Sequence, residues 1–173
     1  MDKFIIVSGL RGDYHNNYGL FITPRVNIRY SPAEKTAIKA MVGRGQKTAS
    51  IISENIGMLA SSRDIIIEGS NADLHYGLDP EIAWNTGASF GQEFVLGMQD
   101  GLFRVDYYYT WFTNQIIANY DRNPGVVYLS NLDGESYSHS MQAQVDYELF
   151  TRFDIRLAYR FNDVRSTIDG ELL

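Results

Sequence analysis

The sequence predicts an all-β protein, an antiparallel up-and-down meander of about seven strands. Three observations predict it. Apolar and polar residues alternate with a period of two over most of the chain, the connections alternate between short and long, and aromatic residues gather near the ends of the alternating segments. Alternation gives a sheet two chemically different faces, and hairpin connections give antiparallel pairing.

The composition narrows the possible function classes. The chain of 173 residues is long enough for one domain with a core of its own. It carries 15 Lys and Arg against 21 Asp and Glu, a formal net charge of −6, and an acidic chain is a poor nucleic-acid binder. The lack of cysteine excludes a disulfide framework, a Cys-based zinc site and a thiol nucleophile. The three histidines show no metal-ligand spacing, so we expect no metal site.

The mean hydropathy and the aromatic content favour different classes of protein. The mean hydropathy of −0.23 is that of a soluble protein, whereas 12 Tyr, 9 Phe and 2 Trp make 13% of the chain aromatic. No apolar run approaches the roughly 20 residues of a membrane-spanning helix, and the first residues lack the apolar stretch and cleavage site of a signal peptide. A transmembrane β-barrel stays possible, because its apolar residues occupy every second position and average hydropathy misses them.

The clearest alternation runs from Leu20 to Tyr30. Its even-numbered residues are apolar or aromatic, whereas the odd-numbered ones include Arg25, Asn27 and Arg29. A strand whose two faces meet different media needs this pattern. Alternation of this kind predicts strands over Phe4–Leu10, Leu20–Tyr30, Thr36–Val42, Ile82–Phe94, Phe103–Trp111, Met141–Leu149 and Ile155–Phe161.

The connections between these segments alternate in length. Hairpin parity places the short turns at one end of the sheet and the long loops at the other, an asymmetry typical of outer-membrane barrels. Short turns are predicted at Ser31–Glu34, Gly97–Gly101 and Phe150–Arg152, and long loops at Asp13–Gly19, Arg44–Pro80 and Gln115–Val126. The second long loop far exceeds the usual ~4–6 residues, is compatible with a short helical turn over Ser50–Leu59, and is expected to carry function.

Aromatic residues lie near both ends of the predicted strands. The distance from Phe103 to Trp111 is about 26 Å along a strand, which projects to about 20 Å at a typical barrel tilt. This is comparable with the ~25 Å apolar band between the aromatic girdles of a membrane barrel. We therefore expect Tyr107, Tyr109 and Trp111 on the convex face of a curved meander. The predicted girdle residues are Tyr30, Phe94, Phe103 and Tyr147 near the short turns, and Trp84, Trp111 and Phe161 near the long loops.

Charged residues occupy the opposite face of the same segments. In a barrel they line the lumen, and in a soluble protein they form a solvated face of mixed charge. They are Arg25, Arg29, Lys39, Arg104, Asp106, Asp146, Glu148, Asp154, Arg156 and Arg160. A loose acidic group in the second long loop lacks the spacing of a calcium site and is interpreted as solvated; it consists of Asp64, Glu68, Asp73, His75 and Asp79. No Ser, His and Asp residues are spaced as a catalytic triad, so we expect neither catalytic residues nor a cofactor.

Successive segments of the chain resemble barrel segments of a TonB-dependent outer-membrane receptor, most of all receptors of the Bacteroidetes type. They follow the family's order and cover nearly the whole chain. They include GLRGDYHNNYGLFITPRVNIRYSP, AMVGRGQKTASIISENIGMLASSR, YGLDPEIAWNTGASFGQEF, RVDYYYTWFTNQI and SYSHSMQAQVDYELFTRFDIRLAYRF. The most specific parts are the start of one strand, with Pro80, Glu81, Ala83, Trp84 and Asn85, and the end of the next, Phe112 to Ile116.

The resemblance implies uptake of a scarce nutrient (a ferric siderophore, cobalamin or a glycan) across the outer membrane of a Gram-negative bacterium. Its implied partners are outer-membrane lipid, the TonB complex and a plug domain. Because the family's barrel has about 22 strands and follows a plug, residues 1–173 are expected to be an internal piece of such a barrel. The ligand-path candidates are Arg25, Arg29, Lys39, Arg44, Arg104, Asp106, Arg156 and Arg160.

Two other function classes remain open at this point. A soluble, lipocalin-like β-barrel would turn its Tyr and Trp face inward around a small apolar ligand and its charged face outward. An enzymatic barrel, such as an outer-membrane lipase or protease, is disfavoured because no catalytic constellation is present.

Overall fold

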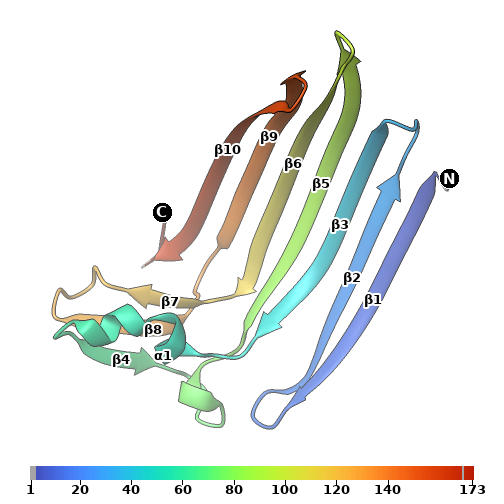
Figure 1. Cartoon of the computed structure of the whole chain (residues 1–173). Coiled ribbons are helices and arrows are strands. Elements are labelled where there is room, and N and C mark those ends of the chain that lie inside the picture. Colours follow the sequence, from blue (N-terminus) through green and yellow to red (C-terminus); the bar gives the residue numbers. More distant parts are fainter. Residues whose placement is uncertain (1–2, 169) are drawn as a thin grey trace.

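The fold is one curved antiparallel sheet with a small second sheet at one end (Figure 1). The structure is a computed structural model that describes residues 3–168 and 170–173. The main sheet has eight strands in the order β1-β2-β3-β5-β6-β9-β10-β11. Its strands are β1 Phe4–His15, β2 Gly19–Tyr30, β3 Thr36–Lys47, β5 Glu81–Leu96, β6 Gln99–Asn114, β9 Ser136–Phe150, β10 Phe153–Ile168 and the short β11 Glu171–Leu172.

The predicted meander is confirmed, and each of the seven predicted strands is longer than expected. The predicted strand Ile155–Phe161, for example, lies inside β10. Beyond Phe161 the residues are mostly polar on both faces, but backbone pairing with β9 continues to Ser166. Alternation marks only the part of a strand whose faces meet different media, so it misses such an extension.

The connection over Asp13–Gly19, predicted as a long loop, is a short turn. β1 continues to His15 and β2 begins at Gly19, with pairing along the whole hairpin. At the opposite end the predicted short turns are confirmed. Gly97 and Met98 join β5 to β6 with φ angles of 59° and 70°, the left-handed pair that a tight two-residue hairpin requires.

The two remaining long connections fold together into a unit that we call the loop module, residues 48–80 and 115–135 (Figure 1). The predicted helical turn is present as α1 and η1. Three strands that sequence patterns did not predict form the second sheet, in the order β4-β8-β7, with β4 and β8 parallel. The elements are α1 Ile51–Glu54, η1 Ile56–Ala60, β4 Asp64–Glu68, η2 His75–Gly77, β7 Ile116–Asn119 and β8 Val126–Asn131.

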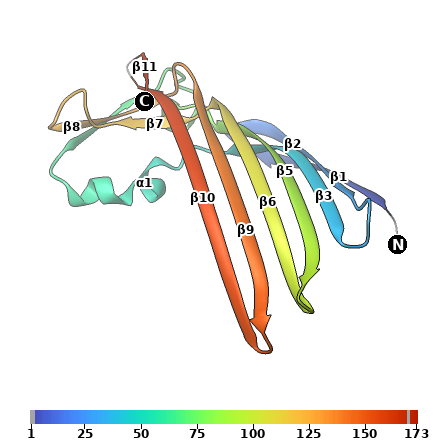
Figure 2. The same cartoon turned by 90° about the horizontal axis from the view of Figure 1, so that it is seen from above.

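Buried apolar side chains are confined almost entirely to the loop module. Among residues 3–168 and 170–173, Phe21 is the only buried hydrophobic residue outside it. The module's core consists of Ala49, Ile51, Met58, Leu78, Val127 and Leu129. The main sheet therefore has no second layer packed on either face in the part of the chain described. Viewed from above, the seven long strands lie side by side, and the module projects beyond one end (Figure 2).

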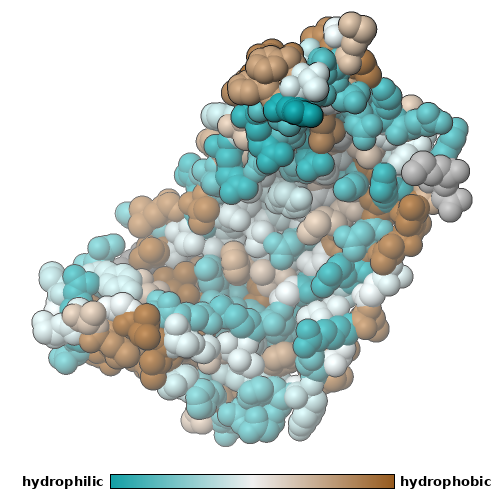
Figure 3. Space-filling view, in the orientation of Figure 1, coloured by the Kyte–Doolittle hydropathy of each residue, from teal (hydrophilic) through white to brown (hydrophobic). Residues whose placement is uncertain are grey.

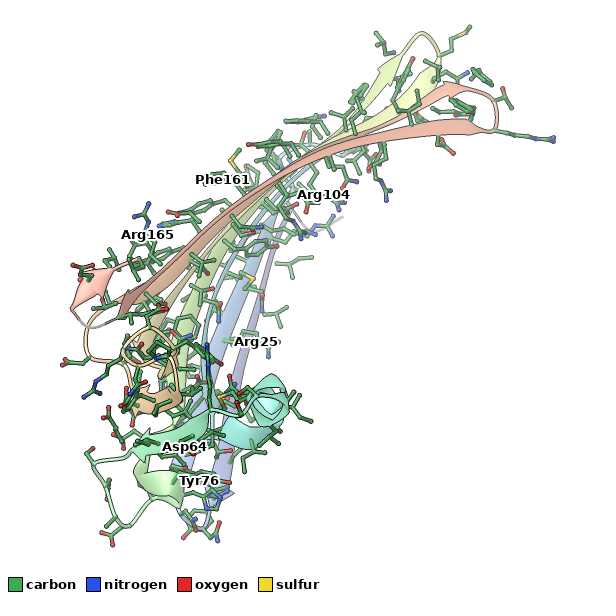
Figure 4. All side chains as sticks on the ribbon, turned by 90° about the vertical axis from the view of Figure 1, so that its left-hand side faces the viewer. Arg25, Asp64, Tyr76, Arg104, Phe161 and Arg165 are labelled. Atoms are coloured by element: carbon green, nitrogen blue, oxygen red, sulfur yellow. The ribbon has the colours of Figure 1, made fainter. Side chains whose placement is uncertain are left out.

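Register separates the side chains of the main sheet into two faces. Figure 4 places Phe161 and Arg165 on the convex side of the sheet, and Arg25 and Arg104 on the concave side. Cross-strand pairing then assigns the rest, because paired residues share a face. Tyr107 pairs with Met141, which pairs with Phe161, so the odd-numbered residues of β6 lie on the convex face, as expected for Tyr107, Tyr109 and Trp111. No described helix has the length and apolar character needed to cross a membrane.

Gly101 provides a test of packing on the convex face near the short turns. A Cβ at this position would overlap the ring of Phe94, which stacks on Tyr147 with ring centroids 6.2 Å apart. Gly101→Ala is expected to destabilise the folded protein by about 1–3 kcal/mol, because the Phe94 ring must leave the stack. Unfolding of the single variants and of the double variant with Phe94→Ala measures the coupling. Equal costs of Gly101→Ala in both backgrounds would contradict the contact.

Candidate ligand-facing surface of the sheet

The concave face of the main sheet contains a hollow of about 550 Å³. Figure 3 shows this face, with hydrophilic and neutral residues over its middle and hydrophobic residues toward the margins. All seven long strands contribute to the hollow. Its polar and charged lining residues are Asn27, Arg29, Lys39, Ser89, Arg104, Asp106, Tyr108, Ser140, Gln142 and Arg160.

One cross-strand row runs through the middle of the hollow. Each member pairs with the next across neighbouring strands: Arg29, Lys39, Ser89, Asp106, Gln142 and Arg160. The hydroxyl of Ser89 donates to the Asp106 carboxylate at 2.5 Å. The guanidinium of Arg160 donates to the side-chain oxygen of Gln142 at 2.7 and 3.1 Å. The row therefore has a hydrogen-bonded half, from β5 to β10, and a purely cationic half on β2 and β3.

Four cations of the concave face make no direct hydrogen bond or ion pair. In the part of the chain that the structure describes, the side chains of Arg25, Arg29, Lys39 and Arg104 make no hydrogen bond or salt bridge (the six ion pairs are elsewhere). Asp106 accepts a hydrogen bond from Ser89 and keeps its negative charge, and Arg104 interacts electrostatically with Asp146. The middle of the concave face is therefore a band with more basic than acidic side chains.

The short-turn end of the same face has the opposite charge. A second hollow there, of about 760 Å³, is lined by more acidic than basic side chains. Arg156 is bonded to Asp146 at 2.5 Å, and Asp146 also accepts a hydrogen bond from Gln144 at 2.6 Å. The charged lining residues are Lys35, Glu93, Asp100, Asp146, Glu148, Asp154 and Arg156.

Seven of the eight ligand-path candidates lie on the concave face. The structure groups five of them in the central hollow (Arg29, Lys39, Arg104, Asp106 and Arg160), and places Arg25 in a neighbouring hollow toward the long loops and Arg156 in the acidic one.

Arg44 differs from the other ligand-path candidates in register. It pairs with Trp84 of β5, a residue of the convex face, and alternation along β3 gives it the same orientation as Val42. It also lies beyond Gly43, the last residue of β3 that pairs with β2. Its guanidinium donates to the Ile22 carbonyl oxygen at 2.7 Å, which bridges the two strands where their backbone ladder has ended. Arg44 nevertheless lines the same hollow as Arg25, toward the long loops.

The seven predicted girdle residues all lie on the convex face. Trp84 and Trp111 stack near the loop module with ring centroids 6.1 Å apart and planes within 10°, and Phe94 stacks on Tyr147 near the short turns. Phe161 differs from the other six in its position along the strand, because it lies in the middle of β10 and not at the end near the long loops. The predicted position of Phe161 near the long loops is wrong because polar residues continue β10 beyond the predicted end of the strand.

Lys47 joins the loop module to the main sheet, a role that no sequence pattern indicated. Its ammonium group lies 2.7 Å from carboxylate oxygens of both Glu54 in α1 and Glu81 in β5. Glu81 also accepts a hydrogen bond from the Ile116 backbone at 3.0 Å, which ties β7 to the same point. Partial burial disfavours the charged form of Lys47, but the two carboxylates outweigh this effect and raise its pKa.

Replacing Lys47 by methionine is expected to release α1 from the sheet. Because the lysine side chain is 53% exposed, the loss in global stability stays below about 1 kcal/mol, while proteolytic cleavage near Glu54 increases. Because the pKa of Lys47 is raised, its ion pairs contribute fully to stability below the ordinary pKa range of lysine. This contribution is lost as pH rises through the raised pKa. Cleavage of the wild type should thus be constant from neutral to mildly alkaline pH. Equal cleavage of Lys47→Met and of a Lys35→Met control would contradict the anchoring role.

Aromatic and charged contacts hold the two loops of the module together. The Arg122 guanidinium lies 2.8 Å from Glu68 and 4.4 Å from the ring centroid of Tyr128, and Arg63 lies over the Tyr120 ring. Of the acidic loop residues, Glu68 is thus part of an ion pair. Among the residues described, no three His, Asp or Glu side chains are grouped so as to hold a metal ion.

A single-layered sheet with an aromatic convex face and a polar concave face is typical of the wall of a transmembrane β-barrel. The family model described as TonB dependent receptor-like, beta-barrel matches residues 1–173, so the chain belongs to this family, whose barrels are outer-membrane proteins. The predicted resemblance is confirmed at the level of the family, and the Bacteroidetes type stays a prediction.

A solved structure similar to this chain is the siderophore receptor PirA from Pseudomonas aeruginosa, with a TM-score of 0.62 and 17% sequence identity. The match covers 95% of this chain and 30% of that receptor chain, so the chain spans less than a third of the receptor's length. At this identity the likeness concerns the fold. No curated protein sequence matches the chain.

Proposed function

We propose that this chain forms part of the barrel wall of an outer-membrane receptor that takes up a scarce nutrient with energy from the TonB complex. Membership of the TonB-dependent receptor-like barrel family supports the assignment to outer-membrane receptors. In this proposal the loop module lies on the outer side of the membrane and the short turns on the periplasmic side. The concave face lines the lumen, where it contacts the nutrient and a plug domain.

The observation that carries the proposal is the exposed apolar convex face. Large hydrophobic side chains on this face remain accessible because nothing is packed on them; Leu157, Tyr159 and Phe161 are 69, 66 and 51% exposed. A contiguous apolar surface of this extent is unfavourable in water and is satisfied by lipid. In the part of the chain that the structure describes, the outer edge of β1 is unpaired, and inside a bilayer such an edge requires a further strand.

The soluble, lipocalin-like alternative requires a closed barrel with its aromatic face inside. In the described residues β1 pairs with β2 alone and not with β10 or β11. The aromatic face is the convex one, and the concave face is polar. These features favour the membrane receptor, and they supply no interior for a small apolar ligand.

Nutrient-limited growth tests the proposal. A strain lacking the complete gene product is compared with wild type under iron limitation, under cobalamin limitation, and with oligosaccharides as the carbon source. The proposal predicts a growth defect on one nutrient class, restored by the gene and abolished again when TonB is removed. Equal growth of both strains on every class, or uptake that does not require TonB, would overturn it.

A further inference from the structure

Pairing between two neighbouring strands of the main sheet stops before the strands end. β2 and β3 pair only as far as Arg25 with Gly43, and beyond this point they diverge toward the loop module (Figure 1). Pro24, the next residue of β2, has no backbone N–H to donate, and proline within a sheet is confined to edges and irregular places. We call this unpaired stretch, between residues 19–24 of β2 and 44–47 of β3, the seam.

Two side chains close the seam where the backbone ladder has ended. The Arg44 guanidinium reaches across it to the Ile22 carbonyl oxygen at 2.7 Å. At the tip of the β1–β2 hairpin, the Tyr18 hydroxyl donates to the carbonyl oxygen of His75 in η2 at 3.4 Å. The same hydroxyl accepts a hydrogen bond from the backbone N–H of Ala49. We call Tyr18 with these two hydrogen bonds the latch, because it ties the hairpin to the loop module.

The latch also packs on the core of the loop module. Tyr18 lies against the buried cluster that includes Ala49, and its ring centroid is 6.2 Å from that of Phe21 and 5.1 Å from that of His15. Phe21 is only 7% exposed, so the hairpin tip and the module meet in one small aromatic contact. A contact between a few side chains opens at a lower cost in free energy than a continuous backbone ladder.

The loop module is attached more firmly on its other side. There β3 stays paired with β5 as far as Lys47 with Glu81, and the Lys47 ammonium group also binds Glu54 of α1 at 2.7 Å. We propose that the loop module is a lid, attached at Lys47 and latched at Tyr18, and that release of the latch opens the seam between β2 and β3. Opening enlarges the hollow of about 510 Å³ that β1, β2 and β3 line at this end of the sheet. The inference goes beyond the proposed uptake, because it does not depend on which nutrient is carried.

The reactivity of single cysteines tests the lid, in the complete gene product freed of other cysteines and reconstituted in lipid vesicles. A thiol at Ala49→Cys, a position 6% exposed behind the latch, reacts with a water-soluble maleimide when the lid opens. A thiol at Val127→Cys, 0% exposed in the module's core, reacts only when the module unfolds. Tyr18→Phe removes the hydrogen bonds of the latch and keeps its ring, so labelling at position 49 is expected to accelerate about fivefold, with no change at position 127.

The matched control is Tyr14→Phe, which removes a hydroxyl group from the same hairpin at a residue that is 79% exposed, and it should leave both labelling rates unchanged. Equal acceleration at positions 49 and 127 in Tyr18→Phe would show that the module unfolds as a whole. An unchanged rate at position 49 would show that the Tyr18 hydroxyl holds nothing closed. Either result overturns the inference, and because the experiment involves no nutrient, both leave the transport proposal intact.

Discussion

Replacing Ala143 by arginine is expected to destabilise the membrane-inserted protein by about 2–4 kcal/mol, the cost of a lipid-facing cation near the middle of a bilayer. Ala143 lies on the convex face of β9, paired with Val105 on one side and Tyr159 on the other. Its cross-strand neighbours therefore offer no carboxylate to pair with a guanidinium, and the charged residues are on the opposite face. The change is measured by equilibrium unfolding of the complete gene product in lipid vesicles.

Ala158→Arg is the matched control, because it makes the same substitution next to Ala143 on the opposite face. Ala158 pairs with Gln144 on the concave face of β10, where substitutions are tolerated, so its effect is expected to stay within about 0.5 kcal/mol. If the two variants lost similar stability, or if Ala158→Arg lost more, the assignment of the convex face to lipid would be wrong.

Replacing Leu129 by alanine is expected to unfold the loop module while the main sheet stays folded. Leu129 is fully buried at 0% exposure in the module's core, and a Leu→Ala change in a core costs about 2–5 kcal/mol. The module contains few other buried residues to absorb this loss. Hydrogen exchange is expected to accelerate in both β4 and β8, because their parallel pairing joins the two loops.

Leu59→Ala is the control for the same module, since this leucine is 60% exposed and its truncation should change little. Faster exchange in β8 without a change in β4 would show that the two loops fold independently. Faster exchange in β6 and β9 as well would show that the module and the main sheet form one cooperative unit.

The main sheet could be predicted because apolar and polar side chains alternate regularly along its strands. A strand between lipid and a polar lumen must alternate, so the sequence alone assigns Arg29, Lys39 and Arg104 to one face and Tyr107 and Trp111 to the other. The ends of the strands could not be assigned in this way. Backbone pairing carries β10 past Phe161 through residues whose side chains are polar on both faces.

The strands of the loop module could not be predicted, unlike its helical turn, because they depend on partners far away in the chain. β4 is a short run without alternation, and its partner β8 begins at Val126, so only the folded structure reveals the pairing. The link from Lys47 to Glu54 and Glu81 is likewise a property of the assembled loops. The face that carries most of the ligand-path candidates could be predicted from alternation, whereas the hydrogen bond from Ser89 to Asp106 depends on the register between β5 and β6.

The most direct test of the lipid-facing assignment uses two adjacent tyrosines of β6. Tyr107 and Tyr108 are each 41% exposed, lie on opposite faces, and belong to a chain without cysteine. Spin labels at Tyr107→Cys and Tyr108→Cys, in the complete gene product reconstituted in a bilayer, report contact with oxygen in lipid and with a water-soluble nickel complex. We predict strong oxygen contact and weak nickel contact at 107, with low oxygen contact at 108. A label at 107 that is open to the nickel complex, or shielded from both reagents, would contradict the account.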